Sequence, residues 1–304
     1  MLSENGSVDT ELLRELVTRC FGPRDGELRF APLGEDSWSY TWQDLWISVR
    51  RDVQGHVPAA YEGAFELHRG GLDFVLAPLA GADGSVVRYL AGFPVVVFPL
   101  LEAGQIGPGA PLTASERAEV EEMLAALHGF AAPDRLPREE FTLPFADALA
   151  ASPAAGPGAG PFGERFAALV RSNADRLDAL QAERDSLMHE LRARDLEFVV
   201  THGDLNGGNV LRTADRLKLA DWGMLQWAPP ERDRYHLSRT LGFPLRGDAN
   251  VLRYYELRWQ LSEIAEYAAV FTRPHGDSAD TRAMWRRLLA YLPENERSGR
   301  PAVR

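Results

Sequence analysis

The sequence predicts a mixed α/β (α+β) protein with two lobes, a small N-terminal lobe rich in β-strands and a larger C-terminal lobe rich in helices. Three observations support this prediction. At 304 residues, the chain is longer than a single hydrophobic core usually serves. Short apolar runs bounded by turn residues, which are typical of strands, are concentrated upstream of Leu101. Downstream of it, apolar residues recur mostly at helical spacing.

The N-terminal lobe is expected to span residues 1–98. A helix over 8–21 is predicted from apolar residues at helical spacing, and a Gly-Pro pair ends it. A second helix is predicted over 58–69, because proline opens it and two glycines follow it. The expected strands cover residues 28–33, 38–42, 45–51, 72–76, 88–90 and 93–100.

The C-terminal lobe is expected to span residues 105–304. Thr113 is predicted to cap a helix that runs to about His128, with Glu116 as its capping-box partner. The Ala/Gly/Pro-rich segment 151–161 is predicted to be a mobile loop within this lobe, because it can bury little apolar area. Further helical spacing covers residues 163–194, 232–241, 250–271 and 278–291.

The composition excludes several classes of protein. A formal net charge of −11 argues against nucleic-acid binding; it suits a cationic ligand and equally an ordinary acidic surface. The single cysteine, Cys20, excludes an internal disulfide. No apolar run reaches transmembrane length, and no apolar signal segment follows Met1. The sequence therefore predicts a cytoplasmic protein without a membrane partner.

The most informative stretch is the polar run 202–210, H-G-D-L-N-G-G-N-V, which lies between two short apolar runs predicted as strands. A further apolar run ends on Asp221. Asp204 can accept the proton of an attacking hydroxyl. Asn209 and Asp221 offer the hard oxygen ligands that suit Mg²⁺. These residue types together indicate phosphoryl transfer from a nucleotide.

The order of these residues resembles the protein-kinase signature, in which H-R-D-L-x-x-x-N is followed by D-F-G. Here it reads H-G-D-L-x-x-x-N followed by D-W-G, the form found in the aminoglycoside phosphotransferase and choline kinase group. The run A-P-P-E-R-D at 228–233 also resembles this group, and most resembles its spectinomycin phosphotransferase branch. Either motif alone would be ordinary turn chemistry, whereas both in order are specific.

The resemblance implies a bilobal kinase-like fold and a role for each polar residue of the signature. It implies that Asp204 is the catalytic residue and that Asn209 and Asp221 are metal ligands. It also implies that His202 shapes the catalytic loop by hydrogen bonding and that Asp233 braces it.

The resemblance also indicates where a nucleotide would bind. The turn that contains Gly34 and Ser37 would cover the phosphates with backbone N–H groups, although a G-x-G-x-x-G motif is absent. Residues 99–104 would form the hinge between the lobes. Backbone groups from Phe98 to Leu100 would hydrogen-bond an adenine edge.

The third strand carries I-S-V-R where kinases carry V-A-I-K, so Arg50 would replace the usual lysine. The only lysine, Lys218, lies in a different predicted strand. A shift of register would bring Ser48 to that place, and Arg50 could instead solvate a strand end. Glu62 is the expected carboxylate partner of this cation, with Glu66 as the alternative.

The expected function is transfer of the γ-phosphate of ATP or GTP, with Mg²⁺, to a hydroxyl of a cationic small molecule. By resemblance the acceptor is an aminoglycoside or aminocyclitol antibiotic, and the activity confers resistance. Two alternatives stay open: a kinase for a metabolite such as choline, homoserine or a sugar, and a kinase-like binding protein without catalysis. The missing strand-three lysine favours the second, whereas Asp204, Asn209 and Asp221 oppose it.

Overall fold

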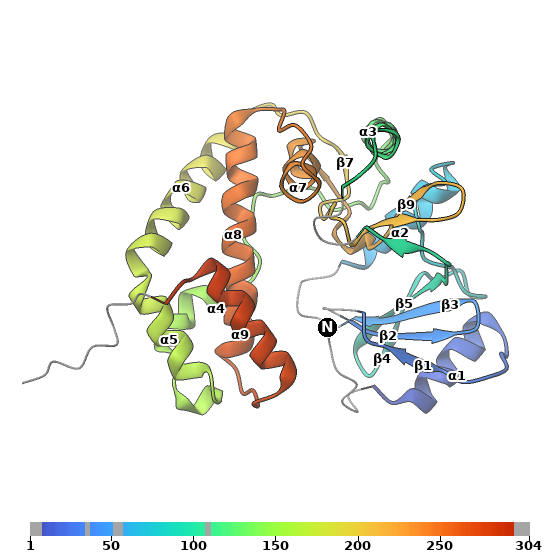
Figure 1. Cartoon of the computed structure of the whole chain (residues 1–304), viewed down its shortest axis with the longest axis horizontal. Coiled ribbons are helices and arrows are strands. Elements are labelled where there is room, and N and C mark those ends of the chain that lie inside the picture. The colour runs from blue at the N-terminus through green and yellow to red at the C-terminus, as the bar shows by residue number, and fades with distance from the viewer. Residues whose placement is uncertain (1–7, 34–36, 51–56, 107–110, 295–304) are drawn as a thin grey trace, which may run out of the picture. The chain divides into compact units, whose positions relative to one another are not determined.

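The computed structural model describes residues 8–33, 37–50, 57–106 and 111–294 (Figure 1). A β-sheet occupies the N-terminal region and helices dominate the C-terminal part, which confirms the predicted mixed α+β class. The chain divides into two compact units. Unit 1 comprises 1–140 and 195–252, and unit 2 comprises 141–194 and 253–304. The predicted hinge, 99–104, falls within unit 1.

Unit 1 contains a five-stranded sheet with the strand order β1-β2-β3-β5-β4, in which every neighbouring pair is antiparallel. The β3 strand pairs with both β2 and β5 and therefore lies at the centre of the sheet. Its position matters for the site, because β3 carries Arg50. The strands are β1 (Arg29–Ala31), β2 (Ser37–Trp42), β3 (Leu45–Arg50), β4 (Val87–Leu90) and β5 (Phe93–Pro99).

The two faces of this sheet differ in chemistry. Helix α1 (Thr10–Phe21), which Asp9 caps, buries its apolar side against one face, where Ile47 and Val49 of β3 lie (Figure 1). Because side chains alternate along a strand, Ser48 and Arg50 project from the other face. The predicted alternation along β3 is therefore confirmed.

Helix α2 (Pro58–Arg69) begins and ends where the sequence predicts. The strand predicted over 72–76 is wrong: the segment forms turns, with one isolated bridge between Val75 and Leu219. Phe74 and Val75 are buried in the core of unit 1, and Leu72 packs against it. Burial therefore accounts for the apolar run, while only two backbone hydrogen bonds join it to Leu219.

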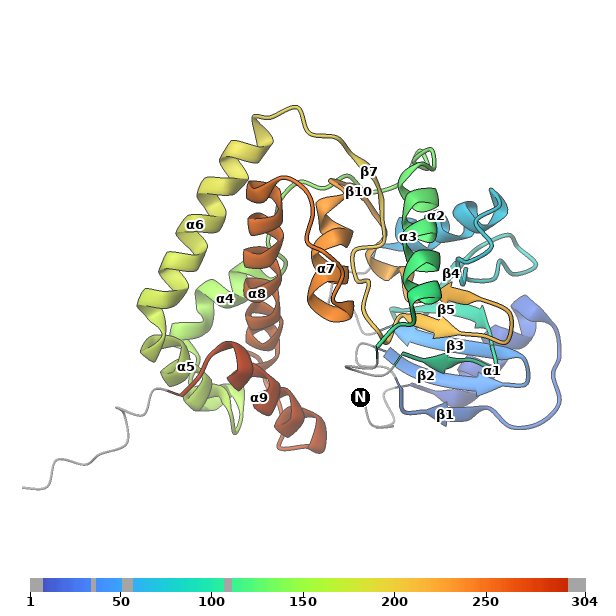
Figure 2. The same cartoon turned by 45° about the horizontal axis from the view of Figure 1, so that its top comes forward.

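The remainder of unit 1 builds the loop region. Strands β7 (Val199–Thr201) and β10 (Gln226–Ala228) pair with each other, and β6 (Gly104–Gln105), β8 (Val210–Arg212) and β9 (Leu217–Leu219) form a small sheet. Helix α3 (Ala114–His128) lies against β9 (Figure 2). The 3₁₀ turn η3 (Trp222–Met224) and helix α7 (Glu231–Leu241) follow.

Unit 2 is helical around a core of its own, to which α5, α6, α8 and α9 contribute. The prediction that 151–161 buries little is wrong for Ser152 and Ala159, which are buried in two short 3₁₀ turns. The helical spacing over 163–194 is divided at Asn173, whose amide donates to the Leu169 carbonyl. The elements are α4 (Ala146–Ala151), η1 (Ser152–Ala154), η2 (Pro157–Ala159), α5 (Gly163–Ser172), α6 (Ala174–Arg192), α8 (Ala249–Phe271), which begins in unit 1, and α9 (Ala279–Tyr291).

Within the described ranges, we find no helix with the length and apolar character needed to cross a membrane.

The capping box of α3 gives a test of this local structure. The Glu116 N–H donates to Thr113 Oγ1 at 3.2 Å, and the Thr113 N–H donates to the Glu116 carboxylate at 2.8 Å. Thr113→Ala removes the first bond and should lower the free energy of unfolding by about 1 kcal/mol. Urea denaturation measures the change. Thr18→Ala, inside α1, is the control and should not destabilise, because alanine is the better helix former. Equal midpoints for Thr113→Ala and wild type would contradict the prediction.

Candidate active site

The loop from His202 to Asn209 connects β7 to β8, and β9 brings Asp221 beside it. The backbone of this loop is tightly packed. A Cβ at position 207 would lie 2.6 Å from the Ile106 carbonyl oxygen, so only glycine fits there. At position 207 the loop backbone therefore packs closely against the backbone of Ile106.

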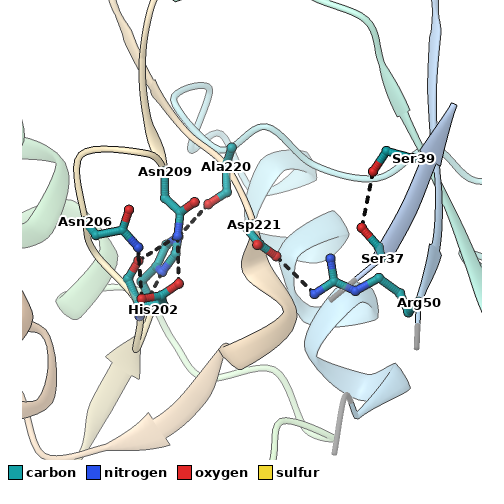
Figure 3. A network of polar contacts seen from close by, with 9 residues as sticks. Ser37, Ser39, Arg50, His202, Asn206, Asn209, Ala220 and Asp221 are labelled. Atoms are coloured by element: carbon teal, nitrogen blue, oxygen red, sulfur yellow. Dashed lines mark hydrogen bonds and ion pairs between the residues drawn. The ribbon is translucent and has the colours of Figure 1, made fainter. Parts of the chain in front are cut away.

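Asp204 is held by two asparagines of its own loop. Asn206 Nδ2 donates to Asp204 Oδ1 at 3.0 Å, and Asn209 Nδ2 donates to Oδ2 at 2.8 Å. Figure 3 shows the Asn206 and Asn209 side chains near each other, with dashed lines for their hydrogen bonds. Each carboxylate oxygen of Asp204 therefore has a fixed orientation, and the side chain is only partly buried. The role of Asn206 was missed in the sequence, because the position falls within the variable part of the motif.

Asp221 faces the cation of the central strand. Arg50 Nη2 lies 3.3 Å from Asp221 Oδ1 (Figure 3). The Arg50 side chain is 8% exposed, whereas that of Asp221 is 43% exposed. The residue of β3 that reaches Asp221 is therefore Arg50 and not Ser48. Ser48 lies one pleat earlier, opposite Ser39.

The expected pair between Arg50 and Glu62 does not form among the described residues, and Glu66 does not replace it. Glu62 is half-buried and Glu66 is exposed on α2. The neighbouring Tyr61 ring lies 5.8 Å from the Arg50 guanidinium, and Asp221 supplies the carboxylate. The helix thus contacts Arg50 through an aromatic ring.

Asp233 is fully buried and accepts hydrogen bonds from the first two residues of the loop 202–209. Its Oδ2 accepts the His202 backbone N–H at 3.0 Å, and its Oδ1 accepts that of Gly203 at 2.7 Å. His128 Nε2 lies 3.0 Å from Oδ2. Burial alone would raise the pKa of Asp233, but the hydrogen bond and charge of His128, the charge of His202 and the Gly203 N–H lower it to about 2. These bonds are what bracing of the loop requires.

His202 lies under the loop rather than in the site. Its side chain is fully buried, and its Nε2 lies 2.9 Å from the Ala220 carbonyl oxygen. The Asp204 N–H donates to His202 Nδ1 at 3.3 Å, and the Trp222 ring stacks at a tilt, with 4.4 Å between ring centroids. Burial lowers the pKa of His202. A buried imidazole with both nitrogens engaged shapes the loop and is not placed to act as a base.

The residues predicted to bind the nucleotide differ in how accessible they are. Gly34 lies outside the described residues. Ser37 is buried, and its hydroxyl lies 3.2 Å from that of Ser39 (Figure 3). Phe98 is buried in the sheet, while the Leu100 N–H donates to the Asp44 carbonyl at 2.7 Å. Leu100 therefore cannot offer this N–H to an adenine unless that bond opens.

Asn209 and Asp221 fit a Mg²⁺ ion by their chemistry. Asn209 uses its amide nitrogen on Asp204, which leaves Oδ1 as an acceptor. No group of three or more His, Cys, Asp or Glu side chains in the described part of the chain could hold a metal by itself. Mg²⁺ does not need one, since it commonly takes one or two protein ligands plus phosphate oxygens and water.

Comparison with known proteins places the chain in a family. Residues 49–270 match the APH family model, described as "phosphotransferase enzyme family", and the chain belongs to that family, as predicted. Protein StrN of Streptomyces griseus is 44% identical over 311 residues, which cover 97% of each chain.

Two solved structures illustrate the fold. The spectinomycin phosphotransferase APH(9)-Ia, in complex with ADP and spectinomycin, gives a TM-score of 0.71 at 17% identity over 93% of each chain. The choline kinase LicA of Streptococcus pneumoniae gives 0.55 at 12% identity over 93% of this chain and 98% of that one. At these identities the likeness is one of fold.

The buried Asp233 predicts a pH dependence of stability. A carboxylate with a folded-state pKa below its unfolded value of 3.8 stabilises the fold above that pH and loses the effect as pH falls through about 2. The free energy of unfolding of the wild type should therefore exceed that of Asp233→Asn most above pH ~4. This difference should shrink by about 2 kcal/mol towards pH 2. Denaturant unfolding at several pH values measures the gap. Asp134→Asn, at an exposed position, is the control. A gap that stays constant with pH would refute the assignment.

Proposed function

We propose that the chain transfers the γ-phosphate of ATP or GTP to a hydroxyl of a small cationic molecule, an aminoglycoside or aminocyclitol antibiotic. The observation that carries this proposal is the Asp204 carboxylate, held by Asn206 and Asn209 beside the Arg50–Asp221 pair. Such a constellation combines a base, candidate metal ligands and a phosphate-binding cation. These are the parts that phosphoryl transfer needs.

Asp204 orients the acceptor hydroxyl and takes its proton. Each of its oxygens already accepts one amide N–H, and a carboxylate oxygen can accept further bonds. The hydroxyl can therefore approach a carboxylate that does not rotate. A fixed base reduces the entropy that must be lost on the way to the transition state.

Arg50 contacts the phosphates, and Asn209 and Asp221 hold Mg²⁺. A Mg²⁺ ion held there would supply positive charge against the charge that develops on the transferred group. A guanidinium suits phosphate oxygens because it is always charged and presents several N–H groups in a plane. At 3.3 Å the Arg50–Asp221 contact is longer than a typical charge-assisted hydrogen bond.

The class of acceptor is supported by two facts. Spectinomycin phosphotransferase shares the fold over most of the chain. The net charge of −11 favours a cationic ligand through long-range attraction. A screen of the purified chain with ATP and with GTP, against aminoglycosides, spectinomycin, choline, homoserine and sugars, tests the proposal. Phosphorylation of a metabolite alone would support the metabolite-kinase alternative, and phosphorylation of nothing would support a silent binder.

Asp204→Asn tests the assignment of the base. The amide keeps the size of the side chain but cannot take a proton, so kcat should fall at least about a hundredfold. Nucleotide affinity should change little, because Asp204 is assigned to the acceptor. Steady-state kinetics with the best acceptor measure the first effect, and equilibrium titration measures the second. Asp215→Asn, an exposed change in the turn between β8 and β9, should behave as wild type. A kcat within a few-fold of wild type in Asp204→Asn would sink the assignment.

Arg50→Ala tests the cation of the central strand. Loss of the guanidinium should raise the nucleotide KM and lower kcat, each by about tenfold or more, because a charge-assisted contact to phosphate disappears. Arg50→Lys should retain part of the activity, since it keeps the charge but loses the fork. Kinetic constants for ATP and GTP in both variants decide the matter. Wild-type constants in Arg50→Ala would mean that the phosphates find their cation elsewhere.

A further inference from the structure

Arg232, in the first turn of α7, is a buried cation directly beneath the catalytic loop. It is 1% exposed and is among the largest fully buried side chains of the described residues. Its Nη1 donates to Thr201 Oγ1 and to the Met224 carbonyl, both at 2.9 Å. Thr201 is the last residue of β7, before the loop, and Met224 ends the turn η3 that follows Asp221. One guanidinium thus joins the segments that carry the proposed base and the proposed metal ligand.

The guanidinium also fills the space beside Gly203. An ideal Cβ at position 203 would lie 2.1 Å from Arg232 Cζ and 2.2 Å from both terminal nitrogens. Gly203 has a φ of +83°, which other residues rarely adopt. Position 203 is where the kinase signature H-R-D carries its arginine. Here a guanidinium reaches the same place from α7, and glycine makes room for it.

Two consecutive residues of α7 therefore contact the same stretch of backbone. Asp233 accepts the N–H groups of His202 and Gly203, while Arg232 packs on Gly203 and bonds to Thr201. Asp204 is the next residue along the chain. A change in these contacts would therefore move the backbone directly beside Asp204.

Packing alone does not explain a buried arginine here. Removing a guanidinium from water is costly, and an apolar side chain of similar length can fill the same volume. The arginine also hydrogen-bonds to two separate segments, at Thr201 and at Met224. An apolar side chain could not fix the distance between these segments in this way. Because misplacement by about 1 Å can cost about a hundredfold in rate, that distance bears directly on catalysis.

We propose that Arg232 is a positioning residue for phosphoryl transfer, which sets the place of Asp204 relative to Asp221. The inference rests on the proposed function. It assigns no contact with the substrate to Arg232. Its loss should therefore act on kcat and leave nucleotide binding largely intact.

Arg232→Met and Thr201→Val test the proposal. The first removes the guanidinium, and the second removes the hydroxyl that accepts from Arg232 and also donates to the Gln226 carbonyl. Both should lower kcat by about ten- to a hundredfold, with the nucleotide KM within about twofold of wild type. Arg232→Lys should recover part of the loss, since an ammonium can still donate to Thr201 or to the Met224 carbonyl. Arg234→Met is the matched control, because Arg234 pairs with Glu231 at a more exposed position of the same helix. If Arg232→Met cannot be purified folded, Thr201→Val carries the test.

The contact at Gly203 is tested separately by a double-mutant cycle on stability. Gly203→Ala is made in the wild type and in an Arg232→Ala background, and denaturation midpoints are compared. The strain of the left-handed backbone is common to both, so the difference reports the clash with the guanidinium. Gly203→Ala should lower the midpoint less when Arg232 is absent. An equal loss in both backgrounds would overturn the contact.

The outcomes separate the two proposals. A wild type that transfers phosphate to no acceptor contradicts the proposed function and removes the basis of this inference with it. An active wild type with unchanged kcat in Arg232→Met and Thr201→Val overturns the positioning role and leaves the proposed function standing. A rise in the nucleotide KM that equals the fall in kcat also overturns it, because the defect would then be general.

Discussion

The site depends on one buried carboxylate. Asp233 accepts the backbone N–H groups of His202 and Gly203 from the first turn of α7, and His128 of α3 contacts the same carboxylate. A fully buried ionised group is costly unless its hydrogen bonds are made, so this arrangement permits little variation. Helices α3 and α7 and the catalytic loop are thereby fixed to one another. This framework positions the backbone beside Asp204, while Asn206 and Asn209 orient its carboxylate.

The framework supports a division of labour between two polar clusters of unit 1. Asp204 is held by the asparagines of its loop, which suits a base that must not rotate. The Asp221 side chain, by contrast, is 43% exposed and contacts Arg50 at 3.3 Å, and this exposure suits a proposed metal ligand. The five-stranded sheet contributes by presenting Arg50 from its central strand. The proposed base is thus held by hydrogen bonds, whereas the proposed metal ligand Asp221 remains exposed.

Much of this could be predicted from the sequence, because the informative signals are local. Alternation along β3, the capping box at Thr113 and the caps of α2 depend on neighbouring residues, and the structure bears them out. The contact between Arg50 and Asp221 and the bond between His128 and Asp233 each join residues that are distant in sequence. The periodicity of the sequence cannot reveal such contacts. The run 72–76 was misjudged because buried turns and buried strands share an apolar composition. Arg232 lies in the recognised run 228–233, but its burial could not be predicted, since an arginine at a helix start is normally solvent-exposed.

We infer that Asp221 and Asn209 form a Mg²⁺-dependent nucleotide site beside Asp204. Calorimetric titration of ATP and GTP into the chain, with Mg²⁺ and with excess chelator, tests it most directly because it needs no knowledge of the acceptor. The account predicts that Mg²⁺ tightens nucleotide binding by wild type at least about tenfold, and that Asp221→Ala abolishes this dependence, since bound phosphates lose their counter-charge. Equal affinity with and without Mg²⁺ in wild type, or an undiminished Mg²⁺ effect in Asp221→Ala, would contradict it.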